Sequence, residues 1–442
     1  MPAGVVIVGG GLAGLSAAVR LTSEGFHVTI FEKRPYWGGR VSSFPDPATG
    51  WEIDNGPHLI TGAYEYTRQF LQTIGSASKI DFQPHLQTVY FDPEKGKASL
   101  RSVSLPGNLS LMAGLLKFRF LRLKDKLGIL KALQRLGRLN ESPELDFFTA
   151  DAWLIRQKQT TAARRYFWDV LCLAALNAPP GLVSFLQFFR VLKKSFWAEK
   201  EKARLGFANA GFQDVFAGPA EAFLRKRGAG LYKKETVLNL EIQNNRAFAL
   251  QLKGRKLSDF DALVLAVPPH ALEKMIPKNF IQQLTVNRIR FHPIVSVHLY
   301  LKTELFPEKF LAFIGGTCQW IFNMNAIRSS KYWEGIWYSV VISGAEEEAK
   351  LPKDTIVSQI FSDFQKIQPG WKPSDVLHIR VIKELSATAP GSPGAEAGRP
   401  SQKTAFKNIF LAGGWTRTGL PDTIESAVLS GELAAKEVMA QS

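Results

Sequence analysis

Hydrophobic positions near the start of the chain change from a strand pattern to a helix pattern and back. A β-branched run, Val5–Val8, leads into a glycine-rich turn, and small and apolar residues with helical spacing follow. A second strand pattern, His27–Phe31, ends at Glu32. The pattern predicts a β-α-β unit, the first element of a parallel sheet covered by helices.

Similar patterns recur in two later parts of the chain, so we expect one discontinuous domain built from residues 1–75, 211–270 and 390–442. The later patterns predict a helix, two strand regions, a buried strand ended by two prolines, a short strand and a closing helix: Glu221–Arg227, Leu231–Leu240, Phe248–Leu252, Asp261–Pro269, Asn408–Gly413 and Thr423–Met439. The closing helix is rich in small residues, which suits close packing on a sheet.

Two insertions, residues 76–210 and 271–389, separate these segments and are expected to form a second domain that binds the substrate. The first insertion reads as mainly helical and basic. The second is richer in aromatic and β-branched residues, for example at Ile294–Leu301 and Gly335–Ile342. Residues 386–402 form a Pro/Gly/Ala-rich stretch, predicted to be a mobile loop. The expected fold class is therefore α/β, with a Rossmann-like domain and a discontinuous α+β domain.

The glycine-rich turn has the spacing of a dinucleotide-binding site. Gly9 permits a tight turn, Gly11 lets the backbone approach a pyrophosphate, and Gly14 lets the helix pack closely on the sheet. The helix N-terminus offers free N–H groups to phosphates. Glu32 follows at the position where an acid bonds a ribose hydroxyl. A second glycine pair with an arginine follows at residues 38–40.

Charge is distributed unevenly along the chain. The net charge is +16, and residues 101–204 hold 19 Lys and Arg against 8 Asp and Glu. Such asymmetry favours an anionic partner surface. No nucleic-acid-binding module is recognisable, so we expect no nucleic acid partner. The two cysteines, Cys172 and Cys318, match no disulfide or zinc spacing, and no metal site is expected.

The basic segment also carries amphipathic patterns. Apolar residues at 116, 120, 123, 127 and 130 follow helical spacing, and Lys or Arg recurs every seven residues from Lys117 to Arg138, which predicts one helix over 109–139. A second candidate spans Phe185–Trp197. We expect a peripheral protein on the cytoplasmic, anionic face of a membrane. The alternative is that both apolar stripes pack into the core. No run of about 18 apolar residues occurs, and the first strand begins too early to leave room for a signal peptide.

The whole 5–42 pattern resembles the extended nucleotide motif of the amine oxidase and carotenoid desaturase group of flavoproteins. Three more stretches resemble the hydroxysqualene dehydroxylase family, also called squalene-associated FAD-dependent desaturases: DNGPHLITGAY at 54–64, FWD and CLAALNAPP within 167–180, and LAGGWTRTGLP with TIESA within 411–427. The resemblance runs in order through nearly the whole chain. It implies an FAD-binding domain of the glutathione reductase/amine oxidase type.

The resemblance also implies an activity and a site. Family members remove the hydroxyl of hydroxysqualene with reduced FAD, giving squalene for bacterial squalene and hopanoid synthesis. The implied partners are a long apolar isoprenoid substrate and other squalene-pathway enzymes. Residues expected to contact FAD are Gly9, Gly11, Leu12, Ala13, Gly14, Glu32, Lys33, Gly38, Gly39, Arg40, Gly56, Pro57, His58, Val237, Gly413, Gly414, Trp415, Leu420, Thr423 and Ile424. Residues 408–425 contain no Cys or His, so we expect the FAD to be non-covalent.

The chain departs from the family pattern at three positions. The family usually has Gln where this chain has Pro57, usually Asp where it has Gly414, and often Asp where it has Arg417. The acid usual at 414 bonds the ribityl or diphosphate region. For protonation of the leaving hydroxyl the first candidate is His58, because histidine titrates near neutrality, and the second is Asp422. A structural, hydrogen-bonded role for His58 is the alternative.

Three other functions are compatible with parts of the sequence. A carotenoid-type desaturase or isomerase shares the fold, the flavin and an apolar polyprenyl substrate. An amine oxidase would need an aromatic pair facing the flavin, which Trp415 alone does not supply. A non-catalytic membrane scaffold that retains FAD is the third alternative.

Overall fold

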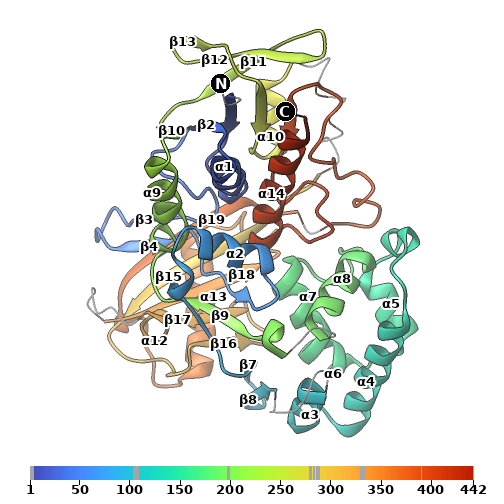
Figure 1. Ribbon diagram of the computed structural model, residues 1–442. Helices are drawn as coiled ribbons and strands as arrows, with labels where there is room; N and C mark the ends of the chain where they lie inside the picture. The colour runs from blue at the N-terminus through green and yellow to red at the C-terminus, as the bar shows by residue number, and fades with distance from the viewer. Residues whose placement is uncertain are drawn as a thin grey trace.

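The computed structural model describes residues 4–102, 109–196, 200–277, 281, 284, 289–328, 335–389 and 391–441. At the centre of its upper part in Figure 1 lies a five-stranded parallel sheet of order β10-β2-β1-β14-β20. Its strands are β1 Gly4–Val8, β2 His27–Glu32, β10 Gly230–Lys233, β14 Ala262–Leu265 and β20 Ile409–Leu411. The three chain segments expected to share a domain therefore all contribute strands to this sheet, and the predicted β-α-β unit is confirmed.

Alternation along the strands explains how the parallel sheet is covered. Val5 and Ile7 of β1 point to one face, where helices cover them, and Val6 and Val8 point to the other. The helices on the first face are α1 Leu12–Ser23, α2 Glu65–Thr73, α9 Gly218–Lys226 and α14 Ile424–Gln441. On the second face lie the antiparallel strands β11 Val237–Gln243, β12 Arg246–Leu252 and β13 Arg255–Leu257, with helix α10 Pro269–Met275. Both faces are therefore buried, as parallel sheets require.

A seven-stranded, mostly antiparallel sheet lies below the parallel sheet in Figure 1. Its order is β19-β15-β18-β17-β16-β7-β8, with bounds Val376–Thr388, His292–Leu301, Ile336–Ser343, Trp320–Asn323, Phe310–Phe313, Gln87–Asp92 and Gly96–Arg101. Helix α13 Lys353–Ile367 packs on one face. Both insertions contribute strands, because β7 and β8 come from the first and the other five from the second.

A helical lobe fills the lower right of Figure 1. It contains α3 Leu109–Lys117, α4 Leu123–Arg138, α5 Ala150–Arg156, α6 Thr161–Ala163, α7 Asp169–Leu176 and α8 Phe185–Phe196, with short helical turns at Pro143–Phe147, Arg164–Trp168 and Lys200–Ala203. None of the helices in the described part of the chain is long and apolar enough to cross a membrane.

Short strands and turns connect these layers. Strand β3 Ser43–Pro45 pairs with β4 Glu52–Asp54. A three-stranded sheet has the order β5 Ile60–Thr61, β9 Leu205–Ala208 and β6 Ile80–Phe82. The remaining short helices are Ala77–Lys79, Gln213–Ala217, α12 Met324–Ile327 and Pro373–Asp375.

The prediction of one helix over 109–139 was wrong, because the chain turns between α3 and α4. Phe118 and Phe120 are both buried, yet residues two apart point to nearly opposite sides of a helix. A turn lets both rings enter the same core. Asp125 then accepts a hydrogen bond from the backbone N–H of Arg122 (3.0 Å) and starts α4.

The second amphipathic candidate packs inward. The apolar face of α8 is buried in the core of the helical lobe, and the described members of this face are Phe185, Phe188, Phe189 and Leu192. Trp197, the predicted end of this helix, lies outside the described residues. The core alternative therefore holds for α8.

The strand pattern over Leu231–Leu240 also divides. Its first half is β10 in the parallel sheet and its second half is β11 in the three-stranded sheet. The backbone turns between them at Lys234, where φ is +60°.

Candidate cofactor groove and buried cavity

The glycine turn between β1 and α1 forms a close-packed cradle. A Cβ on Gly9 would lie 2.4 Å from the carbonyl oxygen of Ala266, and one on Gly14 would lie 2.0 Å from the carbonyl oxygen of Gly9. By contrast, a Cβ on Gly11 would meet only the Cα of Gly39, at 3.9 Å. Packing therefore requires glycine at positions 9 and 14, whereas Gly11 leaves an open side where a ligand could approach.

The N-terminus of α1 faces this open side without a side-chain cap. Gly11 occupies the capping position, and the first turn, which includes Leu12 and Ala13, contains no acid. The first N–H groups of a helix have no partner within the helix, so they and the helix dipole favour an anion here.

Glu32 lies beside the cradle, where it was predicted. Its buried carboxylate accepts hydrogen bonds from the backbone N–H groups of Gly10 and Arg34, both at 2.8 Å. The backbone N–H of Glu235 reaches the carbonyl oxygen of Glu32 (3.0 Å), so the start of β11 at Val237 lies near the same end of the groove. Lys33 is exposed beside it.

The second glycine pair closes the groove from the other side. The N–H of Gly38 donates to the carbonyl oxygen of Gly10 (2.8 Å), and Gly38 and Gly39 have φ of +105° and +64°. Glycine adopts these backbone conformations without strain, so the chain can turn tightly here and place Arg40 next to the cradle.

Arg40 is joined to the start of α14 by an ion pair. Its Nη1 lies 3.2 Å from Oδ2 of Asp422, whose side chain is 2% exposed. Asp422 also accepts the backbone N–H of Ala389 (3.0 Å). Asp422 is therefore engaged in holding Arg40 in place, and it does not line the cavity described below.

Asp422 also explains the departure at Gly414. A Cβ on Gly414 would lie 2.0 Å from Oδ1 of Asp422, so the carboxylate occupies the space where a side chain at 414 would begin. The acid expected from the family at 414 is absent, and an acid from eight residues further on fills that place. Gly413 and Trp415 on either side are held by packing and by a hydrogen bond from Gly413 N–H to Ser430 Oγ (2.7 Å). Helix α14 then begins at Ile424, after Leu420 and Thr423.

A small cavity lies beyond Arg40. The Asn55 side chain donates to the carbonyl oxygen of Arg40 (3.2 Å), which places the segment of Gly56, Pro57 and His58 next to the groove. The cavity is lined by Asp54, Pro57, His58, Phe207, Ala208, Phe212, Phe322, Met324, Ile327 and Arg328. Its free space is close to that of one water molecule. It is mostly apolar, with three polar side chains.

His58 has an unusual environment in this cavity. Its ring lies 5.3 Å from that of Phe212. Desolvation lowers its pKa to about 4, and Arg40 acts in the same direction while Asp54 opposes. His58 is therefore neutral at pH 7, which removes the near-neutral titration on which its role as a proton donor was based.

Arg328 and Asp54 form a buried ion pair at the cavity wall, with side chains 4% and 2% exposed. Asp54 also accepts a hydrogen bond from Ser43 Oγ (2.6 Å), and its backbone carbonyl accepts one from His298 Nε2 (3.0 Å). The Trp337 indole N–H donates to His298 Nδ1 (3.2 Å). Burial lowers the pKa of His298 to about 4, so its ring is neutral. The Asp54–Arg328 ion pair therefore has uncharged neighbours in His298 and Trp337.

The arginine of this pair keeps an unused donor. Within the described residues, the buried Nε of Arg328 has no hydrogen-bond partner. A buried donor without a partner costs about 1–3 kcal/mol, so it is expected to serve a purpose. The sequence analysis missed this arginine because it belongs to no motif and pairs with a residue 274 positions away.

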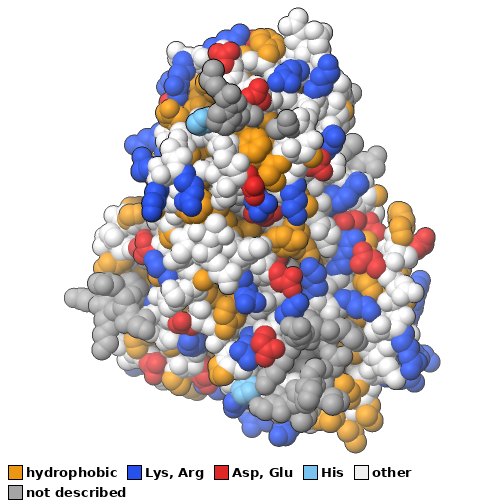
Figure 2. Space-filling model, in the orientation of Figure 1, with side chains coloured by type: hydrophobic (Ala, Val, Ile, Leu, Met, Phe, Trp, Pro, Cys, Tyr) orange, Lys and Arg blue, Asp and Glu red, His pale blue; other side chains and the backbone are white. Residues whose placement is uncertain are grey.

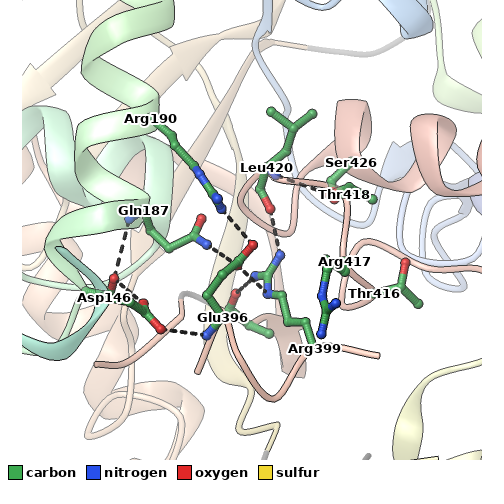
Figure 3. A network of polar contacts seen from close by, with 12 residues as sticks. Asp146, Gln187, Arg190, Glu396, Arg399, Thr416, Arg417, Thr418, Leu420 and Ser426 are labelled. Atoms are coloured by element: carbon green, nitrogen blue, oxygen red, sulfur yellow. Dashed lines mark hydrogen bonds and ion pairs between the residues drawn. The ribbon is translucent and has the colours of Figure 1, made fainter. Parts of the chain in front are cut away.

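A polar network ties the helical lobe to the segment before α14 (Figure 3). Glu396 accepts hydrogen bonds from Gln187 and Arg190 of α8, at 2.6 and 2.7 Å. Arg399, whose pKa is lowered by burial, donates to the carbonyl oxygen of Leu420 (2.6 Å). The loop predicted to be mobile is instead held by hydrogen bonds on both sides, so it connects α8 with the segment that precedes α14.

Comparison with known proteins defines the class. The family model described as flavin containing amine oxidoreductase matches residues 12–439, and the chain belongs to this family. A solved oxidoreductase from Methanosarcina mazei has the same fold, with a TM-score of 0.77 at 16% identity and coverage of 99% of this chain and 100% of that one. The protein is a flavin-dependent oxidoreductase, and its cofactor is FAD.

Within this class, the chain is similar to hydroxysqualene dehydroxylases. The enzyme of that name from Sinorhizobium fredii is 29% identical over 440 residues, which cover 98% of each chain. A 15-cis-phytoene desaturase from Synechococcus elongatus is 23% identical, over 99% of this chain and 96% of its own. The predicted resemblance is confirmed, and the desaturases are relatives as well.

The groove fits FAD. The uncapped helix end and the open side of Gly11 suit a diphosphate, and the carboxylate of Glu32 has lone pairs left for ribose hydroxyls. Arg40, fixed by Asp422, supplies a positive charge along the same path.

Proposed function

We propose that the protein removes the hydroxyl group of hydroxysqualene reductively, giving squalene. Support comes from the full-length similarity to hydroxysqualene dehydroxylases and from the cavity beside the cofactor groove. Balanced overall, the alcohol and reduced FAD give the hydrocarbon, water and oxidised FAD.

The observation that carries the proposal is the buried Arg328, whose Nε donor is free, in a cavity wall that is mostly apolar. A hydrocarbon substrate offers no acceptor for this donor, and an ammonium group, which can only donate hydrogen bonds, offers none either. An alcohol fits, because its oxygen accepts a hydrogen bond and its hydroxyl group matches the water-sized free space of the cavity. The cavity therefore favours a substrate that presents one oxygen.

The protein's own groups have clear tasks in this reaction. When bound, reduced FAD supplies the hydride. Arg328 donates a hydrogen bond to the substrate hydroxyl and stabilises the negative charge that develops as the C–O bond breaks. Asp54 fixes the guanidinium, and the neutral pair of Asp54 and Arg328 avoids an uncompensated charge in the wall.

His58 and Asp422, the predicted proton donors, receive different assignments. We assign neutral His58 a hydrogen-bonding role at the cavity wall, where its ring N–H can hold the departing oxygen. Asp422 is assigned to positioning Arg40, because its carboxylate is bound to Arg40 and Ala389.

Desaturation of a carotene-type chain is the second candidate, since phytoene desaturases are full-length relatives. The two functions use opposite flavin redox states, so one experiment separates them. Purified enzyme is mixed anaerobically with hydroxysqualene, phytoene or an amine, with the flavin reduced or oxidised. Squalene formed only with reduced flavin supports the proposal, and desaturated phytoene formed with oxidised flavin contradicts it.

A further inference from the structure

The junction of α3 and α4 carries an exposed apolar surface. Met112, Leu116, Leu123 and Leu127 are 37%, 48%, 65% and 55% exposed, and we call these four residues the α3–α4 patch. In Figure 2, hydrophobic side chains gather at the lower edge of the molecule, where Figure 1 places α3 and α4, with Lys and Arg side chains nearby. Exposed aliphatic side chains in such a group mark an interaction site.

The turn that separates the two helices creates this patch. Leu123 and Leu127 are one helical turn apart on α4, on the side opposite Ala132 and Leu136, which are buried. The Lys126 ammonium donates to the carbonyl oxygen of Leu116 (2.7 Å), which holds the end of α3 against α4. The leucines of the two helices therefore stand together on a rigid surface.

Basic residues surround the patch. Between 109 and 138 the chain has eight Lys and Arg and one acid, Asp125. Asp125 is buried and accepts hydrogen bonds from Arg122 N–H and Thr160 Oγ1. Within the described part of the chain, no acidic side chain forms an ion pair with the exposed Lys117, Lys124 or Lys131.

We propose that the α3–α4 patch docks the protein on an anionic lipid bilayer. Leucines enter the interfacial layer while the surrounding lysines contact lipid phosphates, as in interfacial helices. A second copy of this chain is a poor occupant, because a symmetric contact would bring the two basic surfaces together. The proposal rests on the patch alone and does not depend on the reaction.

The test is sedimentation of the full-length FAD-loaded protein with vesicles. Vesicles of phosphatidylcholine alone are compared with vesicles that also contain phosphatidylglycerol. We expect binding to the anionic vesicles only, weakened as salt is raised. The variant Leu123→Ser with Leu127→Ser should bind roughly tenfold or more weakly, because it loses two exposed aliphatic side chains that would enter the bilayer. Lys124→Gln with Lys131→Gln should lose about tenfold or more.

Matched controls come from other surfaces of the same chain. Leu238→Ser with Leu385→Ser removes two leucines of similar exposure, 50% and 62%, from strands β11 and β19. Lys353→Gln with Lys372→Gln removes two exposed lysines near α13. Both controls should bind like the wild type.

Three results would overturn the proposal. One is absence of salt-sensitive binding to anionic vesicles, and another is equal loss of binding in patch and control variants. The third is sedimentation velocity without lipid showing a dimer that the leucine substitutions dissociate, which would assign the patch to a second copy.

Discussion

Replacement of Gly414 by Ala tests whether Asp422 holds Arg40 in the position where it is predicted to contact FAD. The new Cβ would lie 2.0 Å from Asp422 Oδ1, whereas ordinary contacts begin at 3.4 Å, so the carboxylate must retreat by about 1.4 Å. We expect this displacement to break its contacts with Arg40, which are now 3.2 and 3.4 Å long.

The size of the effect follows from that lost pair. A hydrogen bond to a charged group contributes about 1.5–3 kcal/mol, and the lower end applies because Arg40 is one-third exposed to solvent. About 1.5 kcal/mol corresponds to roughly tenfold in a binding constant. We expect this loss in FAD affinity, because Arg40 is predicted to contact the diphosphate.

The assay is titration of apoprotein with FAD, followed by quenching of flavin fluorescence. Gly370→Ala is the matched control, since a Cβ there meets nothing within 4 Å. Asp422→Asn, which keeps the size and removes the charge, should weaken FAD binding in the same direction. Wild-type affinity in the Gly414→Ala protein would refute the reasoning.

Three further predictions concern the cradle and the cavity. Gly11→Ala should leave the thermal midpoint of the apoprotein unchanged but weaken FAD binding roughly tenfold or more, whereas Gly14→Ala should lower that midpoint because its Cβ meets the backbone. Calorimetry and FAD titration measure the two effects, and equal behaviour of the two variants would contradict the different roles given to these glycines. Arg328→Met with Asp54→Asn removes both buried charges, so the protein should keep its flavin spectrum while squalene formation falls roughly a hundredfold, and unchanged turnover would exclude Arg328 from oxygen binding. The pKa of His58 is about 4 in the folded protein, below the usual 6.5, so the unfolded chain binds a proton first and the free energy of unfolding should fall as the pH drops from 6.5 toward 4. In urea unfolding, His58→Leu should make the free energy of unfolding depend less steeply on pH over this range, and an unchanged dependence would show that His58 is not desolvated.

The local parts of the fold follow from the sequence. The β-α-β unit and its glycines are specified by residues within one short stretch, where alternation, helical spacing and backbone freedom act locally. The cradle is therefore visible in the sequence, down to the glycine that faces the ligand.

Features that depend on tertiary contacts could not be predicted in the same way. The helix pattern over 109–139 gives no sign that Phe118 and Phe120 must enter one core and break it. The pairing of Arg328 with Asp54, and the use of Asp422 in place of an acid at 414, join residues that only the fold brings together.

The central claim is reductive removal of a hydroxyl group by hydride transfer, and a single turnover in deuterium oxide tests it most directly. The enzyme, reduced anaerobically in D₂O so that the transferable flavin hydrogen is deuterium, is mixed with hydroxysqualene, and the product is analysed by mass spectrometry. The account predicts squalene with one deuterium at the carbon that bore the hydroxyl, formed as the flavin is oxidised. Absence of squalene, or squalene without deuterium at that carbon, would contradict it.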